Sequence, residues 1–252
     1  MATPIPKPLT GPAAWAATDL ERSNDWLVTL DADEITCLDD ALDSVMSQQI
    51  TWSSLTTDQF PLPRLAKKLE VISRELEDGC GMVSLRGISP GRYTADELRT
   101  LWCGLGLNLG VLVYQNPQGQ LLRDICNEGE GVGKTYGQMD TGEGTFLSSR
   151  ARTASTAELR FHTDRADIVG LLCVSRAKSG GETRIASSVK VHNEMIRRRP
   201  EFAALLYAPI YRSRLGEEKG GDQMFYPLPV FGCRDGKFTS HYSRTYVEAA
   251  QL

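Results

Sequence analysis

Hydrophobic side chains change their spacing part of the way along this chain, and that change narrows the folds it can adopt. From residue 31 to residue 46 they recur with the period of about 3.6 residues that marks the buried face of a helix. These positions are Ile35, Leu38, Leu42, Val45 and Met46. Asp31 can cap the first turn and Glu34 completes a capping box, so we predict a helix that begins after Asp31.

Two more helices are predicted before residue 110. One runs from about Pro63 to Gly79, and its apolar positions share one face. The other follows the capping-box pair Thr94 and Glu97 and contains "LRTLWCGLGL". Between the two helices, "GMVSLRGI" at residues 81–88 is typical of a short strand.

Beyond Gly110 the pattern becomes strand-like. The segments "VLVYQ" (111–115), "DIVGLLCVS" (167–175) and "TRIASS" (183–188) are rich in β-branched and aliphatic residues. Helical segments interrupt at 189–199 and after Pro200, and "VFGCRDGKFTSHY" (230–242) predicts a hairpin turning at Asp235-Gly236. Helices first and strands later favour an α+β fold with a mainly β core over an alternating βαβ sheet.

Composition excludes several classes of protein. The net charge is −4 with both signs mixed, which argues against a nucleic-acid partner. No apolar run approaches the roughly 18 residues that span a bilayer, and the N-terminus lacks a signal-peptide core. The six cysteines form no CxxC pair, so we expect buried thiols in a reducing compartment. We therefore predict a cytoplasmic protein with no membrane partner.

Two glycine-containing stretches resemble nucleotide-binding motifs only superficially. In "EGEGVGKTY" the position that a P-loop reserves for its first glycine is Glu128, whose carboxylate would repel phosphate. "GLGLNLG" at 104–110 lacks the dinucleotide spacing and is better explained by packing of a helix against a strand. Residues 127–157 are nearly free of apolar side chains and are expected to form a long loop, a candidate lid.

His162 and Asp164 are the residues most suggestive of chemistry. Two residues apart on a strand, their side chains would point to the same face and could hold one metal ion. A second histidine would complete the two-histidine, one-carboxylate triad that leaves open positions on Fe(II). The alternative is a surface histidine that hydrogen-bonds its neighbour.

The stretch "FHTDRADIVGLLCVSRAKSGGETRIASS" (161–188) resembles the TauD/TfdA family of Fe(II)/2-oxoglutarate-dependent dioxygenases. The resemblance implies that His162 and Asp164 bind Fe(II), and that Thr183, after the Gly180-Gly181 turn, contacts the cosubstrate 2-oxoglutarate. It also implies O₂ as a reactant and oxidation of a small organic acid, amino acid or secondary metabolite. Gln115 and Asn116 are candidate pocket residues, or else surface turn residues.

The implied fold is a double-stranded β-helix, a clavaminate synthase-like jelly roll. We expect a helical flank at residues 1–79 and a partial jelly roll, incomplete at its C-terminus, at 80–252. Self-association into a homo-oligomer stays open.

The chain departs from the family in its second half. Members carry a distal histidine much later in the chain, followed by an arginine for 2-oxoglutarate. Here the remaining histidines are His192, expected on the solvent face of a helix, and His241, with Arg244 too close behind it. His241 is an alternative third ligand, but we expect the distal pair to be absent. The competing hypotheses are an inactive paralogue or fragment, and a metal-binding jelly roll without oxygenase activity.

Overall fold

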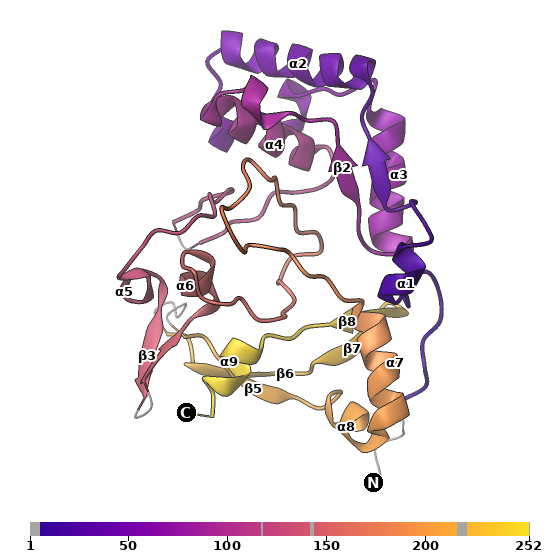
Figure 1. Cartoon of the computed structure of the whole chain (residues 1–252), viewed down its shortest axis with the longest axis vertical. Helices are drawn as coiled ribbons and strands as arrows, with labels where there is room; N and C mark the ends of the chain where they lie inside the picture. The colour runs from indigo at the N-terminus through magenta and orange to yellow at the C-terminus, as the bar shows by residue number, and fades with distance from the viewer. Residues whose placement is uncertain (1–5, 117, 142–143, 216–220, 252) are drawn as a thin grey trace. The chain divides into compact units, whose positions relative to one another are not determined.

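The computed structural model describes residues 6–116, 118–141, 144–215 and 221–251. The chain divides into two compact units. The helical unit comprises Thr10–Arg123 and Ile168–Lys190, and the hairpin unit comprises Asp124–Asp167 and the chain from Val191 onward, with the segment that ends at Leu9. Figure 1 shows the elements of each unit, coloured from indigo to yellow along the chain.

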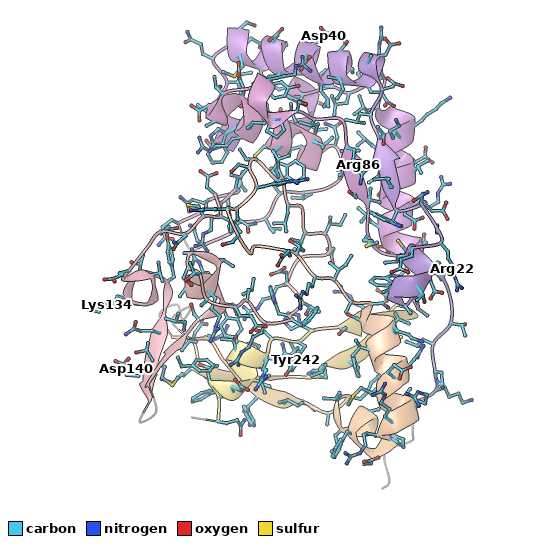
Figure 2. All side chains as sticks on the ribbon, viewed as in Figure 1. Arg22, Asp40, Arg86, Lys134, Asp140 and Tyr242 are labelled. Atoms are coloured by element: carbon cyan, nitrogen blue, oxygen red, sulfur yellow. The ribbon has the colours of Figure 1, made fainter. Side chains whose placement is uncertain are left out.

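The helical unit is built mainly from three helices. In chain order its elements are α1 (Ala17–Leu20), β1 (Leu27–Thr29), α2 (Ala32–Ser47), the 3₁₀ helices η1 (Trp52–Ser54) and η2 (Thr57–Gln59), α3 (Ala66–Asp78), β2 (Ser84–Arg86), η3 (Pro90–Arg92) and α4 (Ala95–Leu107). β1 and β2 pair in parallel, with Leu27 opposite Ser84 and Thr29 opposite Arg86. Asp40, labelled in Figure 2, lies on the exposed side of α2.

Both predicted capping boxes are confirmed. The Glu34 amide donates to Asp31 Oδ1 at 2.9 Å, and the Asp31 amide donates back to Glu34 Oε2 at 2.9 Å. At α4 the Glu97 amide donates to Thr94 Oγ1 at 3.3 Å, and the Thr94 amide donates to Glu97 Oε2 at 2.6 Å. These bonds satisfy amides that the first helical turn leaves without partners, so a local sequence signal suffices to set where each helix begins.

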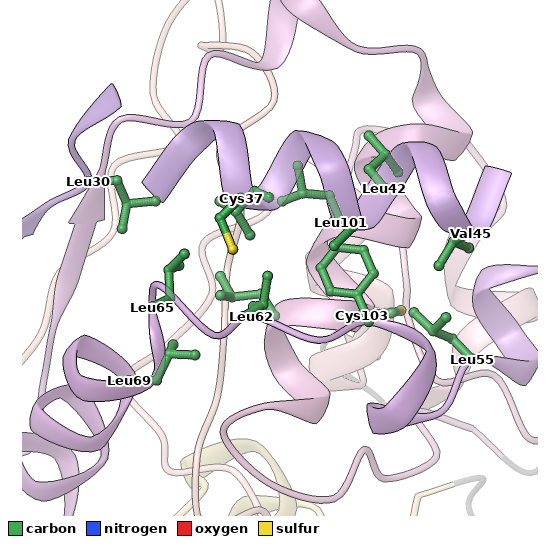
Figure 3. Close-up of a cluster of buried hydrophobic side chains, with 14 of the residues drawn as sticks. Leu30, Cys37, Leu42, Val45, Leu55, Leu62, Leu65, Leu69, Leu101 and Cys103 are labelled. Atoms are coloured by element: carbon green, nitrogen blue, oxygen red, sulfur yellow. The ribbon is translucent and has the colours of Figure 1, made fainter. Parts of the chain in front are cut away.

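The predicted apolar stripes meet in one core, drawn in Figure 3. Leu38 of α2, Leu65 before α3 and Leu101 of α4 are fully buried, and Phe60 is buried with them. Burying each such side chain contributes roughly 1.5–3 kcal/mol, so this core supplies most of the unit's stability. Gly104 faces the Phe60 ring so closely that a Cβ there would overlap it. Close packing against Phe60, which lies in no strand, explains the glycine, so the expected packing of this helix against a strand is not what the position serves.

The hairpin unit holds short antiparallel strands and short helices. In chain order its elements are α5 (Val132–Tyr136), β3 (Gln138–Thr141), β4 (Gly144–Leu147), α6 (Ser149–Thr153), α7 (Ser188–Arg198, which enters the unit at Val191), α8 (Pro200–Leu205), β5 (Ile210–Ser213), β6 (Phe225–Leu228), β7 (Phe231–Arg234), β8 (Lys237–Ser240) and α9 (Arg244–Glu248). The pairs are β3 with β4, β5 with β6, and β7 with β8. Asp235 and Gly236 have φ of 52° and 79°, as the predicted type I′ turn requires.

Several sequence-based expectations are wrong. Residues 127–157 are not one long loop, because α5, β3, β4 and α6 occupy most of them. The segments 111–115, 167–175 and 183–188 form no strands; in the helical unit most of their apolar side chains face solvent, with Val111 90% and Leu171 64% exposed, while Leu112 packs against the core. Strand propensity needs a neighbouring strand to complete the ladder. Within the described residues the sheets are two-stranded, and no closed jelly roll is formed.

His192 was expected to face solvent, and that expectation is wrong too. It is fully buried, its Nε2 lies 2.9 Å from the Tyr207 hydroxyl, and the rings of Phe231 and Phe238 pack around it. A histidine in a helix can occupy a core position when a hydroxyl satisfies its ring nitrogen, which the sequence pattern alone does not reveal.

The cysteines are only partly as expected. All six are free thiols, but three of them are exposed: Cys126, Cys173 and Cys233. Burial raises the pKa of the Cys103 thiol to about 11. None of the described helices is both long and apolar enough to cross a membrane.

We expect Gly104→Ala to destabilise the helical unit. Crowding against Phe60 costs about 1–3 kcal/mol, which outweighs the gain of about 1 kcal/mol from replacing glycine in a helix. Urea unfolding followed by circular dichroism measures the change. Gly91→Ala is the matched control, because a Cβ there meets nothing within 4 Å. Equal stability of the two variants would contradict the packing explanation.

Candidate metal centre and adjoining pocket

The segment that carries His162 and Asp164 is fixed by backbone bonds to the chain after β8. The Thr163 amide donates to the Tyr242 carbonyl at 2.8 Å, and the Tyr242 amide donates to Thr163 Oγ1 at 2.8 Å. His162 lies opposite Ser243 in an antiparallel bridge. Tyr242, which these bonds tie to Thr163, is labelled in Figure 2. Residues about 80 positions apart in the sequence are therefore held together by this bridge.

A side-chain tether reinforces the bridge from α9. Glu248 accepts hydrogen bonds from Arg160 Nη1 and, at 2.5 Å, from Arg244 Nε. The hydrogen bond from Arg244 lowers the pKa of Glu248 most, and the bond from Arg160 lowers it further, so this pKa lies below its usual range. The carboxylate thus joins α9 to the residue two positions before His162.

The His162 ring is oriented by the Arg160 carbonyl. Its Nδ1 lies 2.7 Å from the Arg160 carbonyl, so Nδ1 carries the proton and Nε2 keeps its lone pair. Nε2 lies 3.9 Å from Asp164 Oδ1. That is beyond a hydrogen bond to Asp164, but the exposed His162 does hydrogen-bond the nearby Arg160 carbonyl, so the metal-ligand expectation and its surface-histidine alternative both stay predictions. The side chains of His162 and Asp164 retain 26% and 54% exposure.

The pair fits part of a metal site. Two adjacent donors on an octahedral ion lie about 3 Å apart when each bond is about 2.1 Å. The observed 3.9 Å is wider, and the exposed Asp164 can close it by rotating its side chain. Across the described part of the chain, no group of three histidine, cysteine, aspartate or glutamate side chains is arranged to hold a metal ion. The pair therefore supplies two donors, and the described residues do not bring a third into place.

A pocket of about 670 Å³ adjoins Asp164 within the hairpin unit. Its lining comprises Asp164, Arg165, Ala166, Asp167, Arg214, Tyr226, Leu228, Thr239, Ser240 and His241. The His241 amide donates to the Val230 carbonyl at 2.8 Å, and Arg212 Nη2 donates to the His241 carbonyl. His241 thus lies beside the pocket that contains Asp164, although its ring forms no three-donor group with His162 and Asp164.

Positive charge surrounds His241. The pKa of His241 is lowered, chiefly by burial and to a smaller extent by the positive charges of Arg212 and Arg165. Asp164 raises it. Arg212 is 1% exposed, and burial also lowers its pKa. The pocket lining therefore combines the carboxylates of Asp164 and Asp167 and the guanidinium groups of Arg165 and Arg214 with an imidazole whose neutral form is favoured.

Other residues singled out from the sequence lie in the helical unit. Thr183 is exposed in the segment Ile168–Lys190, and its contact with 2-oxoglutarate stays a prediction. Gly180 and Gly181 have φ of 71° and 76°, so the expected glycine turn before Thr183 is present. The Gln115 amide donates to the Gln120 carbonyl at 2.6 Å, and Asn116 also bonds Gln120. Gln115 and Asn116 are thus turn residues, as the alternative held.

Sequence reasoning missed the arginines of the pocket and Tyr226. Arg165 directly follows the His-Thr-Asp stretch, and Arg212 and Arg214 share one side of a strand by their spacing of two. That spacing is a usable signal, but "IYRSRL" contains no apolar alternation that marks which side is buried. Tyr226 joins them because β6 pairs with β5, which puts Tyr226 opposite Arg212.

Comparison with known proteins adds an independent observation. The sequence model of the taurine catabolism dioxygenase TauD, TfdA family matches residues 48–247. FR-33289 synthase of Streptomyces rubellomurinus (strain ATCC 31215) is 30% identical over 239 residues, which are 94% of this chain and 67% of that protein. Taurine hydroxylase-like protein SAT17 of Stachybotrys chartarum (strain CBS 109288 / IBT 7711) is 28% identical over 234 residues, 91% of this chain and 57% of that protein. The chain therefore spans about two thirds of the length of FR-33289 synthase and somewhat over half of the length of SAT17.

The Glu248 tether predicts a pH-dependent contribution to stability. Because the pKa of Glu248 is lower in the folded chain, its contribution is present above the pKa of the unfolded chain and is lost as pH falls through the folded value. We expect the stability difference between the parent chain and Glu248→Gln to shrink below about pH 4.5. Urea midpoints measured from pH 3 to pH 7 test this.

Glu130→Gln serves as the control, since Glu130 is exposed on the same unit. A Glu248→Gln difference that stays constant across this pH range, or that matches the control, would show that the tether does not stabilise the fold.

Proposed function

The chain belongs to the TauD, TfdA family of Fe(II)- and 2-oxoglutarate-dependent dioxygenases, and on this premise we propose that it oxidises a C–H bond of a small organic acid, amino acid or secondary metabolite. The family membership covers 48–247, which includes the His-Thr-Asp stretch. The observation that carries the proposal is the geometry of His162 and Asp164 on the bridge to Tyr242 and Ser243.

In the proposal, His162 Nε2 and an Asp164 carboxylate oxygen are two metal ligands. The Arg160 carbonyl fixes the proton on His162 Nδ1, which orients the ring and keeps Nε2 available. When bound, ferrous iron and 2-oxoglutarate supply the oxidising chemistry, in which O₂ is consumed. The protein holds the ligands, limits the access of water and orients the substrate in the pocket beside Asp164.

The finer structural assignments are proposals on the same premise. Thr183 would hydrogen-bond 2-oxoglutarate, and the glycine turn before it supports this role. We propose a helical flank at residues 1–79 and a partial double-stranded β-helix domain at 80–252. The antiparallel pairs of β3 to β8 support strands in the second segment, although the two compact units divide the chain elsewhere, with Thr10–Arg123 in one unit. Six free thiols support a reducing compartment, and we propose the cytoplasm.

A second candidate function is favoured by one observation. Within the described residues no group of three side chains that could bind a metal is brought together. A site with two protein ligands holds Fe(II) more weakly than a full triad does. On that basis the chain would be a family member without catalytic activity. Metal affinity separates the two candidates.

Substituting the two ligands tests the proposal. We expect His162→Ala and Asp164→Ala each to weaken Co(II) binding by about tenfold or more, because each removes one of few donors. Co(II) absorbance under anaerobic conditions provides the readout, and Fe(II) with 2-oxoglutarate is then tested for its weak visible charge-transfer band.

Asp58→Ala, an exposed carboxylate of the helical unit, is the control and should bind Co(II) like the parent. His241→Ala tests the third ligand: a further loss of affinity would show that its ring moves to the metal. If the parent, His162→Ala and Asp164→Ala all bind Co(II) with the same affinity, His162 and Asp164 are not the metal ligands. A parent chain that binds no Co(II) at all establishes the second candidate.

A further inference from the structure

We infer that the buried Arg212 is a positioning residue for the proposed metal pair and that it acts through one peptide unit, the one that joins His241 to Tyr242. The inference rests on the proposed function, because it concerns how the two proposed ligands are held. The Arg212 guanidinium binds the carbonyl side of that peptide unit. The hydroxyl of Thr163, the residue between the two ligands, binds its amide side. We call Arg212, this peptide unit and Thr163 the peptide clamp.

The strand β5 turns the Arg212 side chain into the hairpin unit. Successive side chains of a strand point to opposite faces, and Tyr211 is 61% exposed whereas Arg212 is 1% exposed. Pairing of β5 with β6 fixes this arrangement, with Arg212 opposite Tyr226. Arg212 Nη2 then donates to the carbonyls of Pro229 and His241, the residues that follow β6 and β8 by one position. One side chain of β5 thus binds the chain at the ends of two other strands.

Two of these hydrogen bonds meet on a single rigid group. A trans peptide unit is planar, so the His241 carbonyl oxygen and the Tyr242 amide hydrogen point in opposite directions. Arg212 donates to the oxygen, and the Tyr242 amide donates to Thr163 Oγ1 at 2.8 Å. Hydrogen bonds in such a chain polarise one another, and a cationic donor strengthens the next bond most. Arg212 therefore acts on Thr163 without touching it.

A contribution to fold stability does not explain why a cation is buried at this position. Arg212 Nε is buried and has no hydrogen-bond partner among the described residues. Burial lowers the pKa of Arg212, as expected for a charge that is removed from water. The acceptors of Nη2 are neutral carbonyls, and an apolar side chain of similar length would fill the same space without this desolvation cost. The guanidinium is better explained by the carbonyl groups that it fixes.

The clamp bears on the metal pair because Thr163 separates the two proposed donors. His162 Nε2 lies 3.9 Å from Asp164 Oδ1, and the backbone of the intervening residue sets how closely they can approach. Thr163 is held by its hydroxyl and by its amide, which donates to the Tyr242 carbonyl at 2.8 Å. Loss of the hydroxyl bond would leave the donor spacing less well defined. Groups that orient metal ligands in this way typically change metal affinity by about tenfold to a hundredfold when they are removed.

Co(II) titrations followed by absorbance under anaerobic conditions test the inference. We expect Arg212→Met and Thr163→Val each to weaken Co(II) binding about tenfold, whereas Thr163→Ser, which keeps the hydroxyl, should bind within about twofold of the parent. Arg234→Met is the matched control, because Arg234 is an exposed arginine of β7 in the same unit, and it should bind Co(II) like the parent.

The double variant shows whether the two residues act by one route. Because both hydrogen bonds belong to one peptide unit, we expect Arg212→Met to weaken Co(II) binding less than about twofold further once Thr163→Val is present. Losses that instead multiply to about a hundredfold would overturn the route through the peptide unit. Circular dichroism is recorded for every variant. If Arg212→Met fails to fold, Thr163→Val decides alone, and a Co(II) affinity equal to that of the parent overturns the inference.

Hydrogen exchange of the Tyr242 amide in the metal-free chain separates this inference from the proposed function. We expect this amide to exchange about tenfold faster in Arg212→Met and in Thr163→Val than in the parent. If that dependence is present while Co(II) affinity is indifferent to His162 and Asp164, the proposed metal site fails and the clamp stands. Co(II) affinity that requires His162 and Asp164 but neither Arg212 nor the Thr163 hydroxyl gives the reverse result.

Discussion

The pair of hydrogen bonds between Thr163 and Tyr242, beside the antiparallel bridge of His162 with Ser243, is the contact on which the candidate site depends. Two bonds of 2.8 Å join segments far apart in the sequence, and they fix His162 on one side and His241 on the other. Because the bridge uses the backbone and one threonine hydroxyl, it leaves the imidazole and carboxylate side chains free for chemistry. The residue between the two proposed ligands therefore has a structural role of its own: it attaches them to the hairpin unit.

The charged residues around this contact differ between its His162 side and its Asp164 side. On the His162 side, Glu248 forms ion pairs with both Arg160 and Arg244 and so makes a tether between α9 and the His162 segment. On the Asp164 side, Arg212 is buried against carbonyl groups, and Arg165 and Arg214 stack on Tyr226. The His162 side is thus held by ion pairs, and the Asp164 side by cation–aromatic stacking and by hydrogen bonds to carbonyl oxygens.

The sequence predicted what local interactions decide. The caps at Asp31 and Thr94, the type I′ turn at Asp235 and the helix of 189–199 each follow from neighbours within four residues. Long-range pairing was not predictable in this way. The segment 167–175 has the composition of a strand but no partner within the described residues, and His192 is buried because a tyrosine and two phenylalanines from distant segments surround it. The Arg165–Tyr226–Arg214 arrangement likewise depends on strand pairing that residue type does not encode.

The exposed apolar segments of the helical unit affect how the protein behaves in solution. Val111, Val113 and Leu171 place hydrocarbon in contact with water, and the backbone beside them belongs to no sheet. Such surface makes solubility sensitive to the kind of salt present, since excluded ions such as sulfate favour its removal from water. We therefore expect sulfate to lower the solubility of the protein through this surface, while the helical core, which is already buried, is not what responds.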